Sequence, residues 1–321
     1  MSAASVPVDR PVFALLQRAA LIVGVAASLL SLVGAALDHE QFFRSYLVAY
    51  VFWSGLTLGS LALVLLVLLA GGLWGIAIRR VLEAAANTLP LVALLFVPLL
   101  LGVSDIYPWS RGDVSGPNQA SYLNLSSWIA RSAIYFALWL LISFLVQRWS
   151  RKQDVDVDPE FLQRIRRPSA LALIVFALAL TFAMVDWTMS LEPHWWSTIY
   201  PAMVGMGMAL SAYGFAIVIA AFLAQQPPLA HVLSRKLFND LGSLLLAFVM
   251  LWAYLSFSQF MLIYAGNLSE EVPWYVRRLQ GGWEWIAAGM TLSQFALPFV
   301  LLLFRDLKRS ALWLAIVAGV L

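Results

Sequence analysis

Long apolar runs separated by short polar connections make up most of the chain. Eight of these runs are long enough to cross a lipid bilayer as α-helices, because a spanning helix needs about 20 apolar residues. They are predicted at residues 12–37, 46–70, 87–104, 125–147, 169–191, 198–224, 241–265 and 283–304. A ninth run opens at Ala311, and we expect it to continue past Leu321 as a truncated ninth helix. The pattern predicts an all-α integral membrane protein.

Composition agrees with a membrane protein and excludes several kinds of chemistry. The chain is 62% hydrophobic and 12% charged, whereas soluble domains carry about 25% charged residues. It has no cysteine, which excludes disulfides, thiolate-held iron–sulfur clusters and cysteine zinc sites. The three histidines, His39, His194 and His231, lie in or beside predicted loops, so we expect neither haem nor a metal inside the bundle. A net charge of +3 gives no support for nucleic-acid binding.

The distribution of basic residues predicts the orientation in the membrane. The connections after the second, fourth, sixth and eighth runs hold 13 Lys and Arg residues, against four in the connections after the first, third, fifth and seventh runs. Because basic loops stay on the cytoplasmic side, the N-terminus is predicted to be cytoplasmic. The opposite face is acidic and rich in Trp and Pro.

Two groups of four runs are similar to each other. Residues 168–180 read PSALALIVFALAL and residues 309–321 read RSALWLAIVAGVL, and a Pro-Trp pair occurs at 108–109 and at 273–274. Copies four spans apart have the same orientation, which predicts a parallel repeat; chance similarity between apolar helices is the alternative. The predicted organisation is a first helix in 1–44, a four-helix unit in 45–196 with a cytoplasmic loop at 148–168, and a second, incomplete unit in 197–321.

The segment that joins the fifth and sixth runs carries the strongest candidates for chemistry. Asp186, Glu192 and His194 lie among tryptophans at the non-cytoplasmic boundary. A carboxylate inside the apolar region is costly unless it is paired or hydrated, and such residues often mark proton paths. Histidine is the side chain best suited to exchange protons near neutral pH. We therefore predict proton transfer by Asp186, Glu192 and His194; an ordinary aromatic belt with a capped turn is the alternative.

A polar stripe near the end of the seventh run and two charges near the third and fourth runs are the other candidates. A stripe of hydroxyl and amide groups can bind a quinone carbonyl, line a water path or join helices. Arg131 lies one turn into its run at the depth of Asp105, and we expect the two to form a salt bridge. The candidates for quinone contact or a polar path are Asp105, Arg131, Trp187, Tyr200, Ser256, Ser258 and Gln259. Glu270 and Glu271 are expected to face a partner.

Two long segments resemble a known family. Residues 186–201 (DWTMSLEPHWWSTIYP) and 239–278 resemble the F-type membrane subunit of alternative complex III, which belongs to the NrfD-like, or polysulfide-reductase-type, superfamily. The resemblance covers most of the chain from the second run onward. The chain departs from the family at Ser243, where a lysine is expected after Gly242, and at residues 264–266. These departures argue against proton entry from the cytoplasm along this segment.

The resemblance implies two four-helix bundles in a bacterial inner-membrane quinol:cytochrome c oxidoreductase. The chain itself would be redox-silent, with no bound cofactor, and would contact menaquinol or ubiquinol and handle protons. Its partners would be a sister NrfD-like subunit, an iron–sulfur subunit and multihaem cytochrome c subunits. Two other functions remain open: a purely structural anchor for a redox complex, and a secondary transporter. The ionisable groups gather at helix ends rather than at the membrane midplane, which argues against the transporter.

Overall fold

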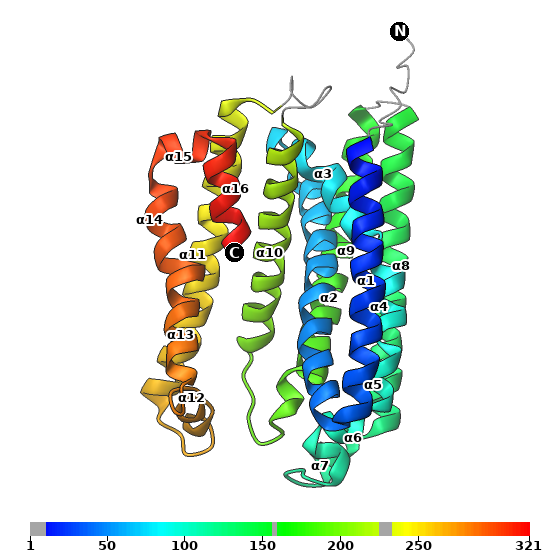
Figure 1. The fold of residues 1–321 in the computed structure, drawn as a ribbon, viewed down its shortest axis with the longest axis vertical. Helices are drawn as coiled ribbons and strands as arrows, with labels where there is room; N and C mark the ends of the chain where they lie inside the picture. The colour runs from blue at the N-terminus through cyan, green and yellow to red at the C-terminus, as the bar shows by residue number, and fades with distance from the viewer. Residues whose placement is uncertain (1–10, 156–158, 225–232) are drawn as a thin grey trace.

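The computed structural model describes residues 11–155, 159–224 and 233–321, and all regular elements in these ranges are helices (Figure 1). Arg10, His231 and part of the predicted 148–168 loop lie outside the described residues. Up to residue 191 the helices are α1 (Pro11–Leu37), α2 (His39–Ala70), α3 (Leu73–Ala86), α4 (Leu89–Leu95), α5 (Val97–Leu101), α6 (Val103–Ile106), α7 (Pro117–Tyr122), α8 (Leu125–Val155) and α9 (Pro159–Trp187). We call residues 39–191 the N-terminal half.

Residues 200–321 form what we call the C-terminal half. Its helices are α10 (Tyr200–Leu223), α11 (Arg235–Gly266), α12 (Val272–Arg278), α13 (Trp283–Thr291), α14 (Leu297–Leu303), α15 (Arg305–Arg309) and α16 (Ala311–Val320). A π-helical stretch, Leu292–Ala296, joins α13 to α14. The short helix α16 begins where the ninth run was predicted to open.

Within the described ranges, eight helical segments are long and apolar enough to cross a membrane. The third span differs most from its prediction: it covers Ala77–Leu101 rather than 87–104, and Pro90 and Pro98 divide it into α3, α4 and α5. Proline starts a helix easily but interrupts one that is already running. The predicted loop at 148–168 is also largely helical, because α8 extends to Val155 and α9 begins at Pro159.

Polar residues end and restart the helices at the expected places. The Asp38 side chain accepts a hydrogen bond from the Gln41 amide and caps α2 directly after α1. Ser234 and Ser310 cap α11 and α16 in the same way. Such caps satisfy backbone N–H groups that have no partner in the first turn of a helix. At Asp38 the chain therefore passes from α1 to α2 within two residues.

Helix α2 lies at the centre of the structure, where it packs against α3, α9 and α10. Its contact with α10 depends on small residues. A Cβ atom at Gly59 would lie 2.2 Å from the backbone oxygen of Met208, and one at Gly55 would lie 2.9 Å from the side chain of Met208. Glycine at these two positions lets the backbones approach, as at many helix contacts in membranes. This contact joins the two halves of the chain.

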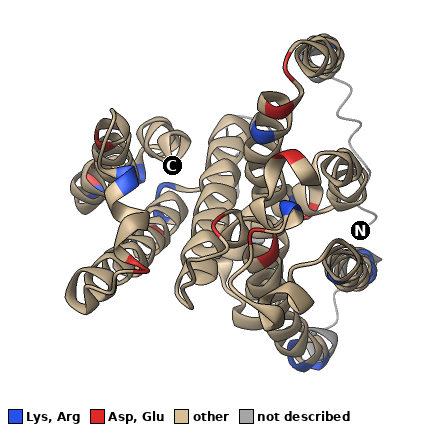
Figure 2. Ribbon diagram, turned by 90° about the horizontal axis from the view of Figure 1, so that it is seen from below, with Lys and Arg blue, Asp and Glu red and all other residues tan. Residues whose placement is uncertain are grey.

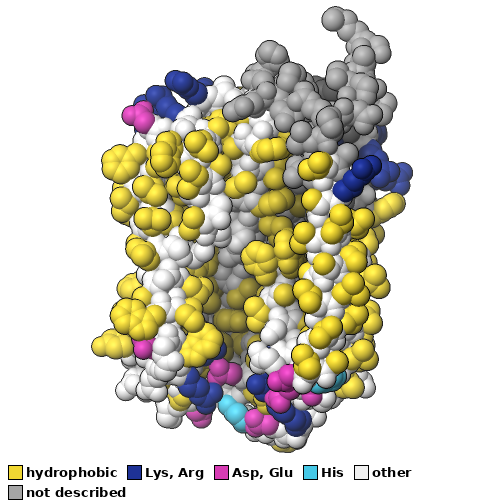
Figure 3. Space-filling view, viewed as in Figure 1, with side chains coloured by type: hydrophobic (Ala, Val, Ile, Leu, Met, Phe, Trp, Pro, Cys, Tyr) yellow, Lys and Arg dark blue, Asp and Glu magenta, His cyan; other side chains and the backbone are white. Residues whose placement is uncertain are grey.

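Charged side chains separate the two ends of the bundle. The end where α2, α8, α10 and α14 finish, at the top of Figures 1 and 3, carries most of the Lys and Arg residues, and we call it the basic end. The opposite end, seen from below in Figure 2, carries acidic residues on its connections and helix ends, and we call it the acidic end. A broad band of hydrophobic side chains lies between them (Figure 3). This arrangement fits a bilayer around the middle of the molecule.

Candidate functional site

A buried ion pair lies inside the acidic end of the N-terminal half. Asp186, near the end of α9, is fully buried. The Nε and Nη2 atoms of Arg131 in α8 each donate to one of its carboxylate oxygens at 2.8 Å. The Tyr135 hydroxyl donates to the same carboxylate at 2.7 Å. A bidentate arginine with an added hydroxyl supplies the compensation that a buried carboxylate needs.

The expected salt bridge between Arg131 and Asp105 is therefore wrong. Helices α8 and α9 pack directly against each other, so Arg131 meets Asp186. Asp105 lies in α6 beside the start of α2, and its carboxylate instead contacts Nδ1 of His39 at 2.9 Å. Both carboxylates have the right depth, and the packing of the helices decides which one the arginine reaches.

Aromatic residues enclose the Asp186–Arg131 pair. The Trp187 indole donates to the Ser132 hydroxyl at 3.0 Å, and the Tyr107 hydroxyl donates to the backbone oxygen of Trp187 at 2.9 Å. The Arg131 guanidinium lies 3.8 Å from the centre of the Tyr122 ring. Burial, together with the charge of Asp186, raises the pKa of the Tyr122 phenol to about 12, so the phenol stays protonated at neutral pH. This arrangement fixes the pair in place and leaves it away from the cavities described below.

Glu192 and His194 have other partners. Nε2 of His194 lies 2.8 Å from Oδ1 of Asp113, and its Nδ1 lies 2.6 Å from the Ser115 hydroxyl. Glu192 forms ion pairs with Arg278 at 3.1 Å and with Arg277 at 3.4 Å. Asp186, Glu192 and His194, predicted as one group, thus belong to three separate interactions.

Glu192 and His194 nevertheless line the same cavity at the acidic end. This cavity has a volume of about 310 Å3 and also contains side chains of Asp113, Glu270 and Arg277. We call it the acidic cavity. Asp113 and Arg277 were missed by the sequence interpretation, because their contact with this segment depends on how distant loops fold. A cavity lined by three carboxylates and a histidine can accept and pass protons.

A larger apolar cavity of about 770 Å3 lies in the C-terminal half among α10, α11, α12 and α13. We call it the apolar cavity. Its lining residues are Met203, Met250, Trp252, Ala253, Tyr254, Ser256, Phe257, Phe260, Trp274, Tyr275, Arg278, Leu279, Ala287, Met290, Thr291 and Phe295. Burial raises the pKa of the Tyr275 phenol to about 12, against the opposing effect of Arg278.

One buried polar atom in the wall of the apolar cavity has no hydrogen-bond partner. The Ser256 hydroxyl is buried and unpaired, although buried polar groups are nearly always satisfied. Its neighbours in the predicted polar stripe have other surroundings. Gln259 is buried and accepts a hydrogen bond from the Ser197 hydroxyl, and Ser258 is half-buried and lies outside the cavity lining. Within the stripe, Ser256 therefore lines the apolar cavity, and Gln259 joins α11 to the segment that precedes α10.

The two cavities meet at Trp274, which lines both of them. The Trp274 ring stacks on Trp195 with 4.7 Å between ring centres, and Tyr200 packs edge-on against Trp195. Glu192 bridges the same boundary through its ion pairs, since Arg278 lines the apolar cavity and Arg277 the acidic one. The stacked rings of Trp274 and Trp195, with Glu192 beside them, thus lie between the apolar cavity and the acidic cavity.

The remaining predicted residues lie near this region without joining it. Glu270 is exposed at the acidic cavity and Glu271 is half-buried at the start of α12. Trp187 belongs to the aromatic core around Asp186. Across the parts of the chain that the structure describes, no group of three His, Asp or Glu side chains is placed to hold a metal ion.

In comparisons with known proteins, no family model and no curated protein sequence matches this chain.

Proposed function

We propose that this chain is a redox-silent membrane subunit of a quinol-oxidising respiratory complex, and that the apolar cavity receives the quinol head. The observation that carries the proposal is the unpaired Ser256 hydroxyl in the wall of a mainly apolar cavity that adjoins the acidic cavity. Ligand sites of this kind combine apolar walls with a few placed polar groups. An oxygen atom of a quinol would satisfy the serine, and the aromatic and methionine side chains would pack on the ring.

The acidic cavity gives the protons a path away from the quinol. Oxidation of a quinol to a quinone releases two electrons and two protons. The electrons would pass to an iron–sulfur cluster or haem in a partner subunit. Glu192, which bridges the boundary at Trp274, is the proposed first proton acceptor, and His194 with Asp113 is the proposed next step toward the surface. We assign Asp186 a positioning role, because it is fully buried and lines neither cavity.

The remaining features of the proposal concern the assembly. The basic end is proposed to face the cytoplasm of a bacterial cell, which places the N-terminus there and the acidic end outside. The two halves are proposed to be a parallel repeat of four-helix units, supported by the contact of α2 with α10 between them. A sister NrfD-like subunit would pack in the membrane, and iron–sulfur and multihaem subunits would dock on the acidic end.

Substitution of Ser256 tests the cavity. We expect Ser256→Ala to weaken binding of a short-chain quinone analogue by roughly five- to tenfold, because the ligand loses one hydrogen bond of about 1 kcal/mol. Ser258→Ala is the matched control, since it removes the same hydroxyl two residues away and outside the lining. Quenching of tryptophan fluorescence by the quinone measures both affinities, with Trp252 and Trp274 in the cavity wall.

Equal affinities of the two serine variants would contradict the assignment of this cavity. The wider proposal is tested by purification of the complex from its native membrane. Haem and iron–sulfur spectra in the purified material would support a redox complex, and a protein that purifies alone without them would contradict it.

A structural anchor is the second candidate, and the sealed Asp186–Arg131 pair favours it. An anchor needs a rigid acidic end for partners but no accessible cavity. If this is its function, both serine variants will assemble and turn over as the unmodified complex does.

A further inference from the structure

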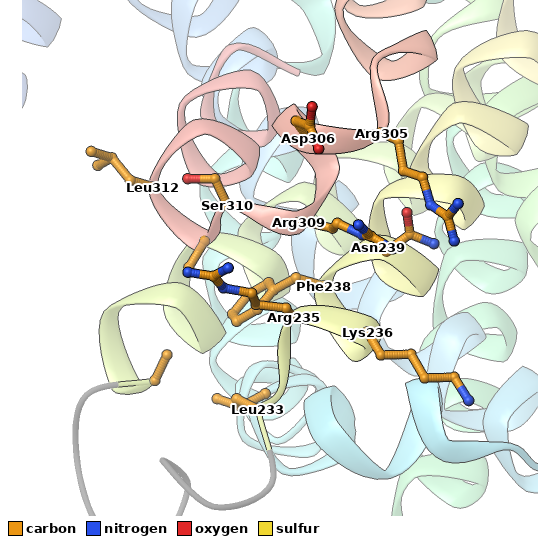
Figure 4. Close-up of a pocket in the computed structure, with 12 residues that line it drawn as sticks. Leu233, Arg235, Lys236, Phe238, Asn239, Arg305, Asp306, Arg309, Ser310 and Leu312 are labelled. Atoms are coloured by element: carbon orange, nitrogen blue, oxygen red, sulfur yellow. The ribbon is translucent and has the colours of Figure 1, made fainter.

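We propose that the basic end of the C-terminal half binds the headgroup of an anionic phospholipid. A cavity of about 720 Å3 opens there among α11, α15 and the start of α16 (Figure 4). It lies at the opposite end of the molecule from the acidic cavity. The quinol proposal does not use it, so the two can fail independently.

Positive charge dominates the lining of this cavity. Arg235 and Lys236 come from α11, and Arg305 and Arg309 come from α15, with Asp306 as the one carboxylate (Figure 4). All four cations are exposed. Within residues 11–155, 159–224 and 233–321, no ion pair joins any of them to a carboxylate. The cavity therefore has unneutralised charge for a phosphate group.

Two helix N-termini add backbone donors at the same place. Helix α11 begins at Arg235 and helix α16 begins at Ala311, and both residues line the cavity. Ser234 and Ser310 each cap one N–H group of these helices, and the other N–H groups of the first turn lack intrahelical partners and favour an anion through the helix dipole. The half-buried Asn239 contributes a side-chain amide to the same lining. Cations, amides and helix ends thus converge on one cavity.

Apolar side chains beside the cavity favour a lipid over a soluble anion. Leu312 lines the cavity and is 67% exposed, and the neighbouring Trp313 is 57% exposed. Phe304, directly before α15, is 60% exposed. Tryptophan at this level is typical of the membrane interface. Acyl chains would cover these side chains, whereas free phosphate would leave them bare. Basic pockets between spanning helices recognise acidic headgroups in this way.

Lipid binding to the full chain in detergent tests the proposal. After removal of bound lipid, the protein is titrated with phosphatidylglycerol, phosphatidylcholine or inorganic phosphate, and native mass spectrometry measures the bound fraction. We expect phosphatidylglycerol to bind at least tenfold more tightly than phosphatidylcholine. Inorganic phosphate at the same concentration should not displace it. Equal binding of the two lipids, or displacement by phosphate, would overturn the proposal.

Charge variants locate the site. Arg235→Gln with Arg309→Gln should weaken phosphatidylglycerol binding by roughly 30-fold, since each cation near a lipid phosphate contributes about a fivefold factor. The matched control removes the exposed Arg166 and Arg167 at the same end but outside the cavity, and should change affinity less than twofold. Equal losses in the two double variants would mean diffuse surface charge and would refute the site.

A variant that strengthens binding keeps the test valid if the arginine variants fail to fold. Asp306→Asn removes the one negative charge of the cavity from an exposed position. We expect it to tighten phosphatidylglycerol binding by about fivefold. Unchanged affinity in Asp306→Asn would overturn the proposal. Tighter binding of an acidic peptide than of phosphatidylglycerol would also overturn it, because the cavity would then be a protein-docking surface.

Discussion

The two halves of the chain differ in how tightly their tryptophan residues are packed. Near the acidic end of the N-terminal half, the fully buried Trp128, Trp139 and Trp187 pack around a charge pair and leave it enclosed. At the corresponding end of the C-terminal half, Trp252 and Trp274 line an apolar cavity of about 770 Å3. Similar aromatic content thus produces a solid core in one half and a chamber in the other.

Polar groups show the same contrast. In the N-terminal half, the Asp186 carboxylate has three hydrogen bonds from Arg131 and Tyr135. In the C-terminal half, the Ser256 hydroxyl has none and belongs to a residue that lines a cavity. The Tyr122 hydroxyl and the Trp139 indole of the N-terminal half are also buried without a partner, but those residues line neither the apolar nor the acidic cavity. A satisfied buried group stabilises a fold, whereas an unsatisfied one costs free energy until something binds to it. We infer that the first half serves as a scaffold and the second as the place for a ligand.

The largest expected effect comes from breaking the enclosed pair. Asp186→Asn should lower the free energy of unfolding by about 3–5 kcal/mol, because it leaves Arg131 partly buried without its counter-charge. Unfolding of the purified protein by increasing fractions of a denaturing detergent measures the change. The control is Asp113→Asn, whose partner His194 is exposed; an exposed pair contributes about 0–1 kcal/mol.

A double variant separates a structural role from a proton-transfer role for Asp186. Replacing the pair by apolar residues of similar size, Arg131→Met with Asp186→Leu, should recover most of the lost stability. If quinol turnover of the complex also returns, the carboxylate only positions its helices. Turnover that stays low in a stable double variant would restore Asp186 as a proton carrier.

A smaller effect compares tryptophans in the two halves directly. Trp187→Phe should cost about 1–3 kcal/mol, because Ser132 loses its indole donor and the dense core gains a void. Trp252→Phe should cost less than about 0.5 kcal/mol, because that ring already borders empty space. The same unfolding measurement applies to both. Similar costs would show that the cavity wall is as tightly packed as the core and would remove the contrast.

Hydrophobic length was enough to predict long apolar helices, but it gave no information on where a helix is interrupted or where charged residues lie within it. The predicted runs leave residues 71–86 as a connection, and this segment includes Arg79 and Arg80. The structure continues the helix through them because Glu83 accepts hydrogen bonds from both arginines and from Ser150 of α8. Charges that compensate one another on neighbouring turns can lie at the edge of a span. Apolar content alone does not show that compensation.

The chemistry-bearing residues were found by type and depth, and their partners were not. Depth along the helix axis follows from sequence position, so Asp105, Asp186 and Arg131 were correctly placed at one end. The direction around the axis depends on which helices pack together, and α8 packs on α9. The contact of His194 with Asp113 depends further on a loop 81 positions away. The periodicity of apolar residues carries no information about contacts between residues so far apart in the sequence.

The smallest expected effect is a difference between the Tyr122→Phe variant and the unmodified protein in how stability falls at alkaline pH. An unfolded tyrosine has a pKa of about 10, and burial raises the pKa of Tyr122 in the folded protein to about 12. Between pH 10 and 12 the unfolded chain therefore binds fewer protons than the folded one, so stability falls as the pH rises through this window. Below pH 10 both states keep the proton and this group adds no pH dependence.

Tyr122→Phe removes the titrating phenol and should make the fall in melting temperature between pH 10 and 12 shallower. Melting temperatures at half-unit steps from pH 7 to 12 measure this, and the constant difference between variant and unmodified protein below pH 9 is the internal control. Tyr275→Phe should act in the same direction, since the pKa of Tyr275 is also raised to about 12 beside the apolar cavity.

The two variants distinguish the halves, because a ligand in the apolar cavity excludes water from Tyr275 only. Adding the quinone analogue should therefore steepen the alkaline fall of the Tyr122→Phe protein and leave that of Tyr275→Phe unchanged. An equal change in both would mean that the ligand binds elsewhere.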